Sequence, residues 1–304
     1  MSIVAIVGAG ILGGTLAYAL AARDKFREVR LIDETSTIAA GKALDIKEAG
    51  PIEHFSTVLS GFKDAAAAAD ADIVILTGPA HASDKEWHED VALSFIDRHI
   101  KANQRQVIIC AGASHRGVVE RSVTDVGVPR RRIIGSAPEA FQAAIRAIVA
   151  LYVNRAPSDI GLTVMGAPPT QTIVPWSQAT VSGFSLSQQL SVTRLRHLQE
   201  QIPYLWPPGP YTLAAAATHV AESLINHTDK TSTCFVVLNG EFGIQNISIA
   251  TPIILAPNGL ERIADLPLST REEFLLQNVS PSTATKSSQR TSSNLQSLSL
   301  IHIS

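Results

Sequence analysis

Apolar runs alternate with helical segments along the first half of the chain. Four runs have the length and the branched apolar content of buried strands: residues 3–7, 28–32, 72–77 and 106–110. Between them lie segments with small residues or helical spacing, at residues 15–22, 65–69 and 86–102. A helix between two strands returns the chain for a parallel neighbour, so this alternation predicts a doubly wound parallel sheet.

The pattern changes after a further predicted strand at 133–135 and a helix over 138–152. The later apolar runs are spaced as strands of a mixed sheet: residues 160–165, 172–181, 234–238 and 247–254. Two more segments have helical patterns, at residues 186–201 and 211–226. We therefore predict an α/β domain over residues 1–142 and an α+β domain over residues 143–279.

Residues 280–304 form a serine- and threonine-rich tail with no acidic residue. Ser and Thr are weak helix formers, and the segment has little apolar surface before residues 298–303. We expect this tail to be disordered. An ordinary flexible terminus is one explanation. A segment foreign to the native coding sequence is the other, because the tail interrupts the amphipathic helix that is predicted to begin with residues 271–277.

The composition is that of a globular protein with a sizeable core. The 304 residues are 45% hydrophobic, and 25 basic residues nearly balance 27 acidic ones, for a net charge of −2. A nucleic-acid-binding surface needs an excess of basic charge, so nucleic acid is not an expected partner. Charged residues are only 17% of the chain, which fits strands buried on both faces and also fits an apolar surface for another subunit.

The two cysteines, Cys110 and Cys234, lie in separate apolar runs. Two such residues make neither a disulfide framework nor a zinc ligand set, so no metal site is predicted. No stretch reaches the ~18 apolar residues that a membrane span requires, and the chain opens on an apolar strand without a basic leader. We expect a soluble, cytoplasmic protein that makes no membrane contact.

The first predicted strand runs directly into a glycine-rich turn, Gly8-Ala9-Gly10-Ile11-Leu12-Gly13, which opens a helix. In this context Gly8 permits the tight turn, Gly10 lets the backbone approach a diphosphate, and Gly13 lets the helix pack on the strand. The amides that open the helix then face the phosphates at the positive end of the helix dipole. Strand, turn and helix together predict a Rossmann dinucleotide site.

Asp33 closes the second predicted strand, 20 residues after Gly13. A carboxylate there accepts hydrogen bonds from both ribose hydroxyls and repels a 2′-phosphate, so NAD is expected in preference to NADP. A glycine turn that binds another nucleotide, or none, is the alternative. The predicted cofactor-binding residues are Gly8, Gly10, Ile11, Leu12, Gly13, Asp33, Thr77 and Gly78.

Over nearly its whole length to Gln277, the chain resembles the NAD-dependent lactate and malate dehydrogenases. The similarity is carried by IVGAGILGGTLAYAL followed by LIDE, by GKALDIKEAGPIEHF, by DADIVILTG and by LNGEFGIQNISIATPIILAPNGLERI. Membership implies a Rossmann NAD-binding domain, an α+β lactate/malate dehydrogenase C-terminal domain and assembly as a homodimer or homotetramer. It implies hydride transfer between NAD(H) and a small 2-hydroxy or 2-oxo acid, and it places the helix that carries Asp45 and Glu48 at a subunit contact.

The catalytic residues that this resemblance implies are missing at the matching positions. The reaction needs a histidine held by an aspartate for proton transfer, and an arginine fork for the substrate carboxylate. The histidine falls on Pro168, and the aspartate and one arginine fall on Phe141 and Ala144. The remaining polar contacts fall on residues without the required chemistry: Ala82, His88, Phe95 and the pair Gly112-Ala113.

Three residues remain as candidates for a relocated acid or base, His115, His81 and Glu139. The two histidines lie on loops expected at the carboxyl ends of the strands, where doubly wound sheets bind ligands, although a solvated surface histidine is the alternative for each. Glu86 and Glu89 are predicted to lie in the solvated start of a helix.

Two functions stay open. The first is a dinucleotide-binding pseudoenzyme that has lost malate and lactate turnover. The second is an active NAD-dependent oxidoreductase with an unusual substrate and a relocated acid/base.

Overall fold

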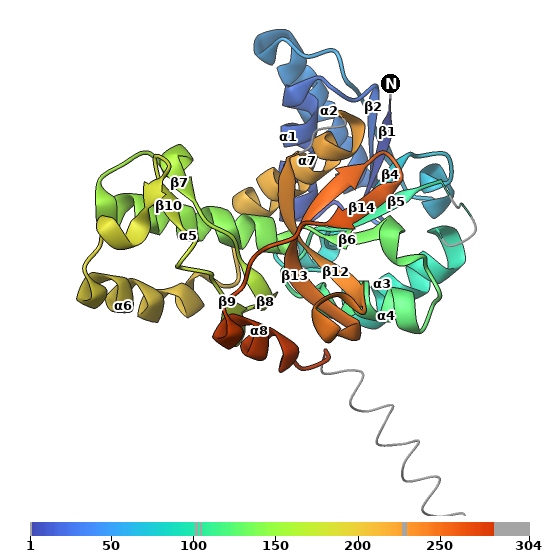
Figure 1. Ribbon diagram of the computed structural model, residues 1–304. Coiled ribbons are helices and arrows are strands. Elements are labelled where there is room, and N and C mark those ends of the chain that lie inside the picture. Colours follow the sequence, from blue (N-terminus) through green and yellow to red (C-terminus); the bar gives the residue numbers. More distant parts are fainter. Residues whose placement is uncertain (1, 101–102, 104, 227–229, 283–304) are drawn as a thin grey trace, which may run out of the picture.

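Six parallel strands form one half of the central sheet (Figure 1). The structure, a computed structural model, describes residues 2–100, 103, 105–226 and 230–282. In spatial order the strands are β3 (Val58–Phe62), β2 (Glu28–Ile32), β1 (Ile3–Val7), β4 (Ile73–Leu76), β5 (Val107–Cys110) and β6 (Ile133–Gly135). The order reverses between β1 and β4, and ligands of doubly wound sheets bind at the carboxyl ends beside such a reversal. The predicted fold class is confirmed.

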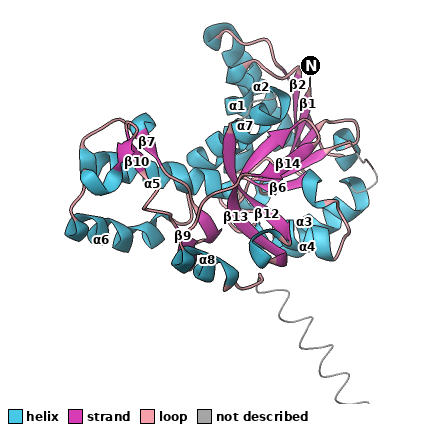
Figure 2. Ribbon diagram, viewed as in Figure 1, coloured by secondary structure: helices cyan, strands magenta, loops and turns pink. Residues whose placement is uncertain are grey.

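Helices cover both faces of the parallel sheet (Figure 2). On one face α1 (Ile11–Arg23) packs against α2 (Ser36–Glu53) and α7 (Pro210–Asn226). On the other face α3 (Glu89–Phe95) packs against α4 (Arg116–Thr124). α5 (Ala137–Val153) follows β6 and contacts α7. The right-handed crossovers of a parallel sheet produce this division of the helices between the two faces.

The sheet continues past β6 into the second half of the chain. β12 (Thr231–Asn239) pairs antiparallel with β6 through Phe235 and Gly135, and along its length with β13 (Gln245–Ala256). The other strands of this sheet are β8 (Met165–Ala167), β9 (Gln171–Ile173) and β14 (Gly259–Ile263). The boundary predicted between residues 142 and 143 lies within α5 and stays a prediction.

Smaller elements complete the second half. A separate three-stranded sheet contains β7 (Ile160–Gly161), β10 (Thr180–Val181) and β11 (Phe184–Ser185), and two helices follow, α6 (Val192–Gln201) and α8 (Thr270–Gln277). Short 3₁₀ turns lie at Ala65–Ala68, Ala80–Ala82, Arg130–Arg132, Pro157–Asp159, Leu186–Gln188, Ile202–Leu205 and Glu241–Gly243. None of the helices in the described ranges is long and apolar enough to cross a membrane.

Several predicted elements differ from the structure. The strands predicted over 160–165 and 172–181 are wrong in extent, because each run holds strand only at its ends. The helix predicted from residue 86 begins at Glu89, because Glu86 and Trp87 bind the backbone of neighbouring loops. It passes into a π-helical turn at Ile96–Ile100, and residues 101–102 lie outside the described chain. The pattern does not predict β3, since its sequence VLSGF has no continuous apolar run.

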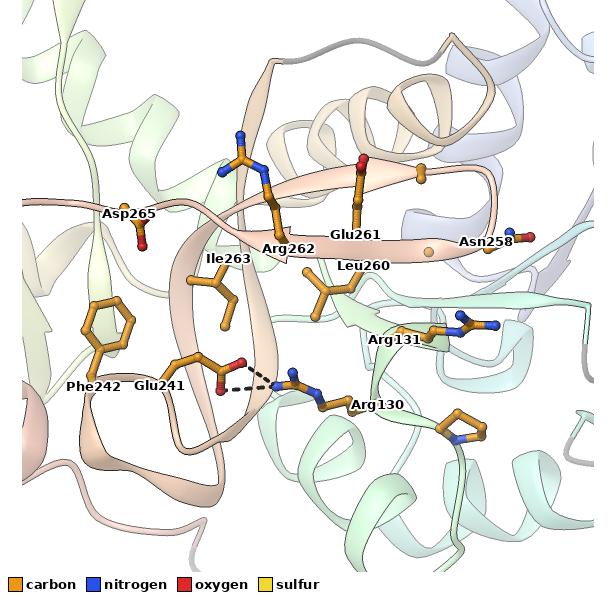
Figure 3. Close-up of a pocket in the computed structure, with 13 residues that line it drawn as sticks. Arg130, Arg131, Glu241, Phe242, Asn258, Leu260, Glu261, Arg262, Ile263 and Asp265 are labelled. Atoms are coloured by element: carbon orange, nitrogen blue, oxygen red, sulfur yellow. Dashed lines mark hydrogen bonds and ion pairs between the residues drawn. The ribbon is translucent and has the colours of Figure 1, made fainter.

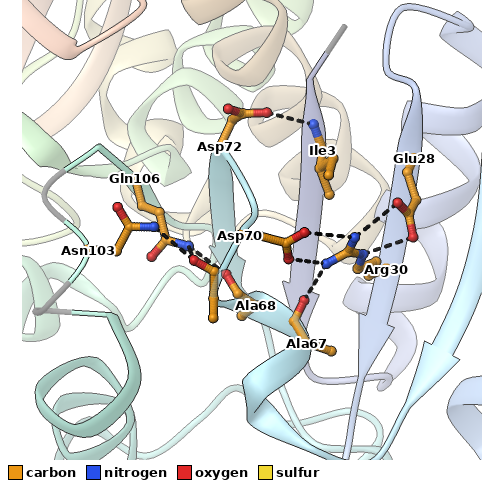
Figure 4. Close-up of polar contacts among 10 residues, drawn as sticks. Ile3, Glu28, Arg30, Ala67, Ala68, Asp70, Asp72, Asn103 and Gln106 are labelled. Atoms are coloured by element: carbon orange, nitrogen blue, oxygen red, sulfur yellow. Dashed lines mark hydrogen bonds and ion pairs between the residues drawn. The ribbon is translucent and has the colours of Figure 1, made fainter.

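Polar side chains join the amino ends of the parallel strands (Figure 4). Asp72, just before β4, accepts a hydrogen bond of 2.8 Å from the amide of Ile3, which opens β1. Arg30 on β2 donates to Glu28 and to Asp70. These contacts tie the β4 connection to β1 and β2 at the amino edge, and the glycine turn lies at the opposite, carboxyl edge.

The end of the described chain packs on α4. Ser282 donates from its amide and its hydroxyl to the buried carboxylate of Glu120, at 3.0 and 3.1 Å. Arg116 donates to the carbonyl of Ser280. The rest of the tail predicted to be disordered, residues 283–304, lies outside the described residues.

A second hydrophobic cluster lies under α5. Phe141 and Ile145 are fully buried in it. The ring of Trp206 packs edge-on against Phe141, with 5.3 Å between ring centroids, and also contacts Phe235 on β12 at 6.2 Å. The three aromatic rings therefore join α5, β12 and the loop before α7 into one packed unit.

Replacing Phe141 with alanine tests this packing. We expect Phe141→Ala to lower the free energy of unfolding by about 3–5 kcal/mol, because it removes a fully buried ring and leaves a cavity. Leu151→Ala is the matched control on the same helix, since Leu151 is 80% exposed, and it is expected to stay within about 0.5 kcal/mol. Urea unfolding measures both, and equal effects would contradict the packing described.

Candidate functional site

The glycine turn has the predicted strand-turn-helix geometry. Gly8 adopts φ +110°, a conformation that L side chains rarely adopt, and a Cβ there would lie 2.3 Å from the carbonyl oxygen of Gly78. A Cβ on Gly13 would lie 2.0 Å from the Gly8 oxygen, so glycine is needed where α1 packs on β1. Both glycines have the structural roles that the sequence predicts.

Asp33 is almost fully buried at the end of β2. Its Oδ2 atom accepts hydrogen bonds from the amides of Ala9 and Ala80, at 2.9 and 2.8 Å, and its Oδ1 atom accepts one from Thr35 at 2.9 Å. The carboxylate predicted to hold ribose hydroxyls is therefore engaged by three backbone amides of its own chain.

Residues 79–87 follow β4 and lie on the glycine turn; we call them the 79–87 segment. The amide of Ile11, the first residue of α1, donates to the carbonyl of Ser83 at 2.7 Å, and the amide of Gly10 donates to the carbonyl of Gly78 at 3.0 Å. A Cβ on Gly10 would lie 2.9 Å from each of these two oxygens. The space beside Gly10 is thus occupied by backbone atoms of the same chain.

Lys42 reaches the turn from α2. Its ammonium donates to the carbonyls of Ala9 and Gly10, at 2.7 and 2.9 Å. Burial lowers the pKa of Lys42, and the charge of Asp33 opposes that shift. The sequence analysis does not identify Lys42, because a lysine on an amphipathic helix carries no local signal of a contact with a distant turn.

The far end of the 79–87 segment is anchored on the loops after β1 and β5. The indole nitrogen of Trp87 donates to the carbonyl of Val7 at 2.9 Å. The carboxylate of Glu86 accepts from the amides of Ala113 and Ser114, at 2.6 and 2.7 Å. The prediction that Glu86 lies in the solvated start of a helix is wrong, because two unpaired amides of the β5–α4 loop bind its charge.

His115 is buried beneath this anchor and is not a solvated histidine. The amide of Gly112 donates to its Nδ1 atom at 3.1 Å, so the neutral ring carries its proton on Nε2. Burial lowers the pKa of His115, while the carboxylate of Glu86 and the backbone of Trp87 oppose that shift. The structure therefore favours the neutral ring.

The three candidate acid/base residues lie apart. His81 is exposed on the 79–87 segment, and His115 is buried below it. Glu139 lies on α5, where it accepts from the amide of Thr233 at 2.6 Å and stands 3.8 Å from the ring of His219. Among the described residues no hydrogen bond or ion pair joins any two of the three, so they form no acid/base constellation in this structure.

Two of the described cavities border the carboxyl edge of the sheet. One, of about 190 Å³, lies beneath the end of β2 and is lined by Asp33, Trp87, Phe95 and His99. The other, of about 720 Å³, lies between the 79–87 segment and the loops at Ala113 and Trp206. Its charged lining consists of Asp84, Lys85, Glu86 and Glu89, together with His88. Phe95 therefore lines the smaller cavity, while Phe141 and Ile145 line neither.

A cavity of about 940 Å³ lies at the other end of the sheet, beside β14 (Figure 3). Arg130, which lines it, comes just before β6 and is paired with Glu241 at 2.8 Å. This cavity is therefore at the amino end of β6, away from the edge where doubly wound sheets bind ligands.

The residue types at the carboxyl edge fit a dinucleotide, but the conformation of residues 78–80 in this structure leaves no room for one. Gly8, Gly10 and Asp33 have the chemistry that a diphosphate and a ribose require. The amide of Gly10 and the Asp33 carboxylate are engaged by residues 78–80. No group of three or more histidine, cysteine, aspartate or glutamate residues suited to a metal ion occurs among the described residues.

The lowered pKa of His115 has a consequence for stability. The unfolded chain binds a proton near pH 6.5 and the folded chain only at lower pH, so stability is expected to fall as pH drops below 6.5. His115→Asn removes the group that binds this proton. The free energy of unfolding of the variant is therefore expected to fall less steeply with decreasing pH, by up to about 1.4 kcal/mol per pH unit. Urea unfolding at pH 7.5, 6.5 and 5.5 measures the slope. His81→Asn, at an exposed position, is the control, and equal slopes for the two variants would refute a shifted His115.

Comparisons with known proteins agree with the fold. Residues 2–90 match the family model of the lactate/malate dehydrogenase NAD binding domain, and residues 209–288 match that of the alpha/beta C-terminal domain, together more than half of the chain. A malate dehydrogenase of Roseiflexus castenholzii is 27% identical, covering 97% of this chain and 98% of the relative. One of Chlorobium phaeobacteroides is 27% identical, covering 88% of this chain and 92% of the relative.

Solved structures show the same fold. Malate dehydrogenase from Salinibacter ruber superposes with a TM-score of 0.81 at 22% identity, over 98% of each chain. Lactate dehydrogenase from Cryptosporidium parvum, solved with lactic acid and NAD, superposes with a TM-score of 0.81 at 21% identity, over 90% of this chain and 93% of the other. With both domain models matched in order, the chain belongs to the lactate/malate dehydrogenase family, whose cofactor is NAD.

Proposed function

We propose that this chain is an NAD-binding family member that has lost turnover of malate and lactate. The observation that carries the proposal is Phe141, at the position where the family resemblance places the aspartate that holds the catalytic histidine. Phe141 is fully buried against Trp206, and the histidine position is Pro168, which has no titratable group. An apolar ring and a proline supply no proton and orient no imidazole.

The charges at the carboxyl edge support the same proposal. An anionic 2-oxo acid needs a paired cation, because an unpaired carboxylate is costly to remove from water. The cavity of about 720 Å³ is lined by three carboxylates, those of Asp84, Glu86 and Glu89, against one ammonium, that of Lys85. Among the residues that the structure describes, no arginine lines it. This lining disfavours an anionic substrate.

The proposed NAD contacts are those predicted from the sequence. Gly8, Gly10 and Gly13 allow close approach of the diphosphate, and Ile11 and Leu12 supply helix amides. Asp33 selects NAD over NADP, with Thr77 and Gly78 at the end of β4 beside the turn. When bound, NAD would supply the hydride-transferring nicotinamide.

The experiment is a calorimetric titration with NADH, followed on the same sample by nicotinamide absorbance with oxaloacetate, pyruvate and longer 2-oxo acids. We expect saturable binding and no oxidation above the protein-free rate, because the acid/base and the carboxylate clamp are both missing. Turnover of any of these acids would overturn the proposal. If that turnover fell in His115→Asn while NADH affinity stayed unchanged, an active oxidoreductase with a relocated acid/base would be the function instead.

The proposal includes a homo-oligomer, supported by exposed apolar side chains on the α1–α2–α7 face. Tyr18 on α1 is 40% exposed, Leu44 on α2 is 57% exposed, and Tyr211 on α7 is 77% exposed. Asp45 and Glu48 share α2 with Leu44, on the helix that the family resemblance places at a subunit contact. Exposed apolar residues on packed neighbouring helices favour burial against a second subunit.

Replacing Leu44 tests the subunit contact. We expect Leu44→Asp to shift the chain from dimer or tetramer toward monomer, because it buries a charge in an apolar interface. Light scattering after size exclusion measures the mass. Phe184→Asp is the control, since Phe184 is 65% exposed on β11, which belongs to the separate small sheet. A monomeric parent protein, or equal masses for both variants, would reject this interface.

A further inference from the structure

We infer that the 79–87 segment is an intramolecular plug, which competes with the diphosphate and ribose of NAD for the glycine turn and Asp33. The inference rests on the proposed NAD binding and adds its regulation: the chain binds NAD only when this segment leaves the turn. Three sets of observations in the structure carry it.

The first set uses the hydrogen-bond donors of the turn. The amide of Ile11, at the start of α1, donates to the Ser83 carbonyl at 2.7 Å. The amide of Gly10 donates to the carbonyl of Gly78, which leads into the segment, at 3.0 Å. Helix N-terminal amides are the donors that bind phosphate in this fold. Two backbone carbonyl oxygens now take the place of phosphate oxygens.

The second set uses the space that the glycines leave. A Cβ on Gly10 would lie 2.9 Å from the Ser83 oxygen and 3.1 Å from the Pro79 oxygen. A Cβ on Gly78 would lie 1.9 Å from the carbonyl oxygen of Lys85. Because these glycines have no side chain, a diphosphate could approach the backbone closely. In this structure the segment fills that space, so the plug and a diphosphate cannot occupy the turn together.

The third set uses the carboxylates. Oδ2 of Asp33, the proposed partner of the ribose, accepts from the Ala80 amide at 2.8 Å. The segment is also held at its far end, where Glu86 accepts from the amides of Ala113 and Ser114 and Trp87 donates to Val7. Hydrogen bonds to an ionised carboxylate are stronger than neutral ones, so Asp33 and Glu86 contribute most to closing the plug.

The Glu86 anchor can be removed without touching the glycine turn or Asp33. If NAD binds only to molecules with an open segment, the apparent affinity is the intrinsic affinity multiplied by the fraction of open molecules. Removing the Glu86 carboxylate releases three charge-assisted hydrogen bonds of the closed state, from the amides of Ala113 and Ser114 and from the Ser114 hydroxyl. Glu86→Ala is therefore expected to tighten the dissociation constant for NADH by about tenfold or more.

The control must match the change of charge, since NADH is an anion. Asp84 lies on the same segment with its side chain exposed, and Asp84→Ala removes the same negative charge without removing an anchor. It is expected to change the NADH dissociation constant by less than about twofold. Trp87→Phe removes the indole hydrogen bond to Val7 while keeping an aromatic ring, and serves as a second release variant with an expected tightening of about threefold or more.

Hydrogen exchange of the parent protein measures the plug directly, without any variant. On addition of NADH, the amides of Ala80 and Trp87 are expected to exchange faster, because the segment leaves Asp33 and Thr77, which accept from them in the closed state. Mass spectrometry of the peptide that covers residues 79–87 reports the change.

The outcomes separate the plug from the proposed function. Tighter binding in both release variants, with faster exchange in the 79–87 segment, supports the plug. NADH binding that is equal in parent, Glu86→Ala and Trp87→Phe, or slower exchange in the segment on addition of NADH, overturns the plug and leaves NAD binding standing. Failure of NADH to bind to the parent and to both folded release variants overturns the plug together with the proposed NAD binding.

Discussion

The buried carboxylate of Asp33 holds the carboxyl edge of the sheet together. Its two oxygens accept amides from the loops after β1, β2 and β4, so one side chain sets the distance between three connections that are far apart in the sequence. Lys42 reaches the same glycine turn from α2 and supplies the opposite charge. Bonds of this kind are stronger than neutral hydrogen bonds because the acceptor is ionised and shielded from water. The same carboxylate binds the glycine turn through Ala9 and the 79–87 segment through Ala80.

The two halves of the molecule enter the proposed function in different ways. The glycine turn and Asp33 have the residue types that the proposed NAD site requires. On the second-domain side Phe141, where the resemblance places the catalytic aspartate, packs with Trp206 and Phe235 as an aromatic cluster. An apolar cluster stabilises the junction of α5 and β12 by burial, and it offers no partner to a carboxylate substrate. The proposed loss of turnover and the strength of this packing thus have one physical origin.

Local pattern sufficed where an element is long, periodic and buried. The parallel strands before the glycine turn and Asp33, and the helices α5 and α7, follow from apolar runs and helical spacing. Pattern was insufficient in the region of β7 to β11, where strands of two or three residues depend on their partners rather than on their own sequence. The helix that starts at Glu89 illustrates the same limit. The residues before it have helical propensity, but Glu86 gains more from the amides of Ala113 and Ser114 than from a place in the helix.

By itself the sequence determined the doubly wound fold, the glycine turn and the family, because each of these is a matter of residue type and order. The proposed loss of the family's acid/base, at Phe141 and Pro168, is likewise argued from residue type alone. Only the tertiary structure decided what the polar groups bind. Asp33 receives three amides, His115 is buried with Gly112 as its donor, and Ser83 lies on the first amide of α1. Such contacts join residues from different loops, and which donor meets which acceptor depends on how the sheet brings those loops together.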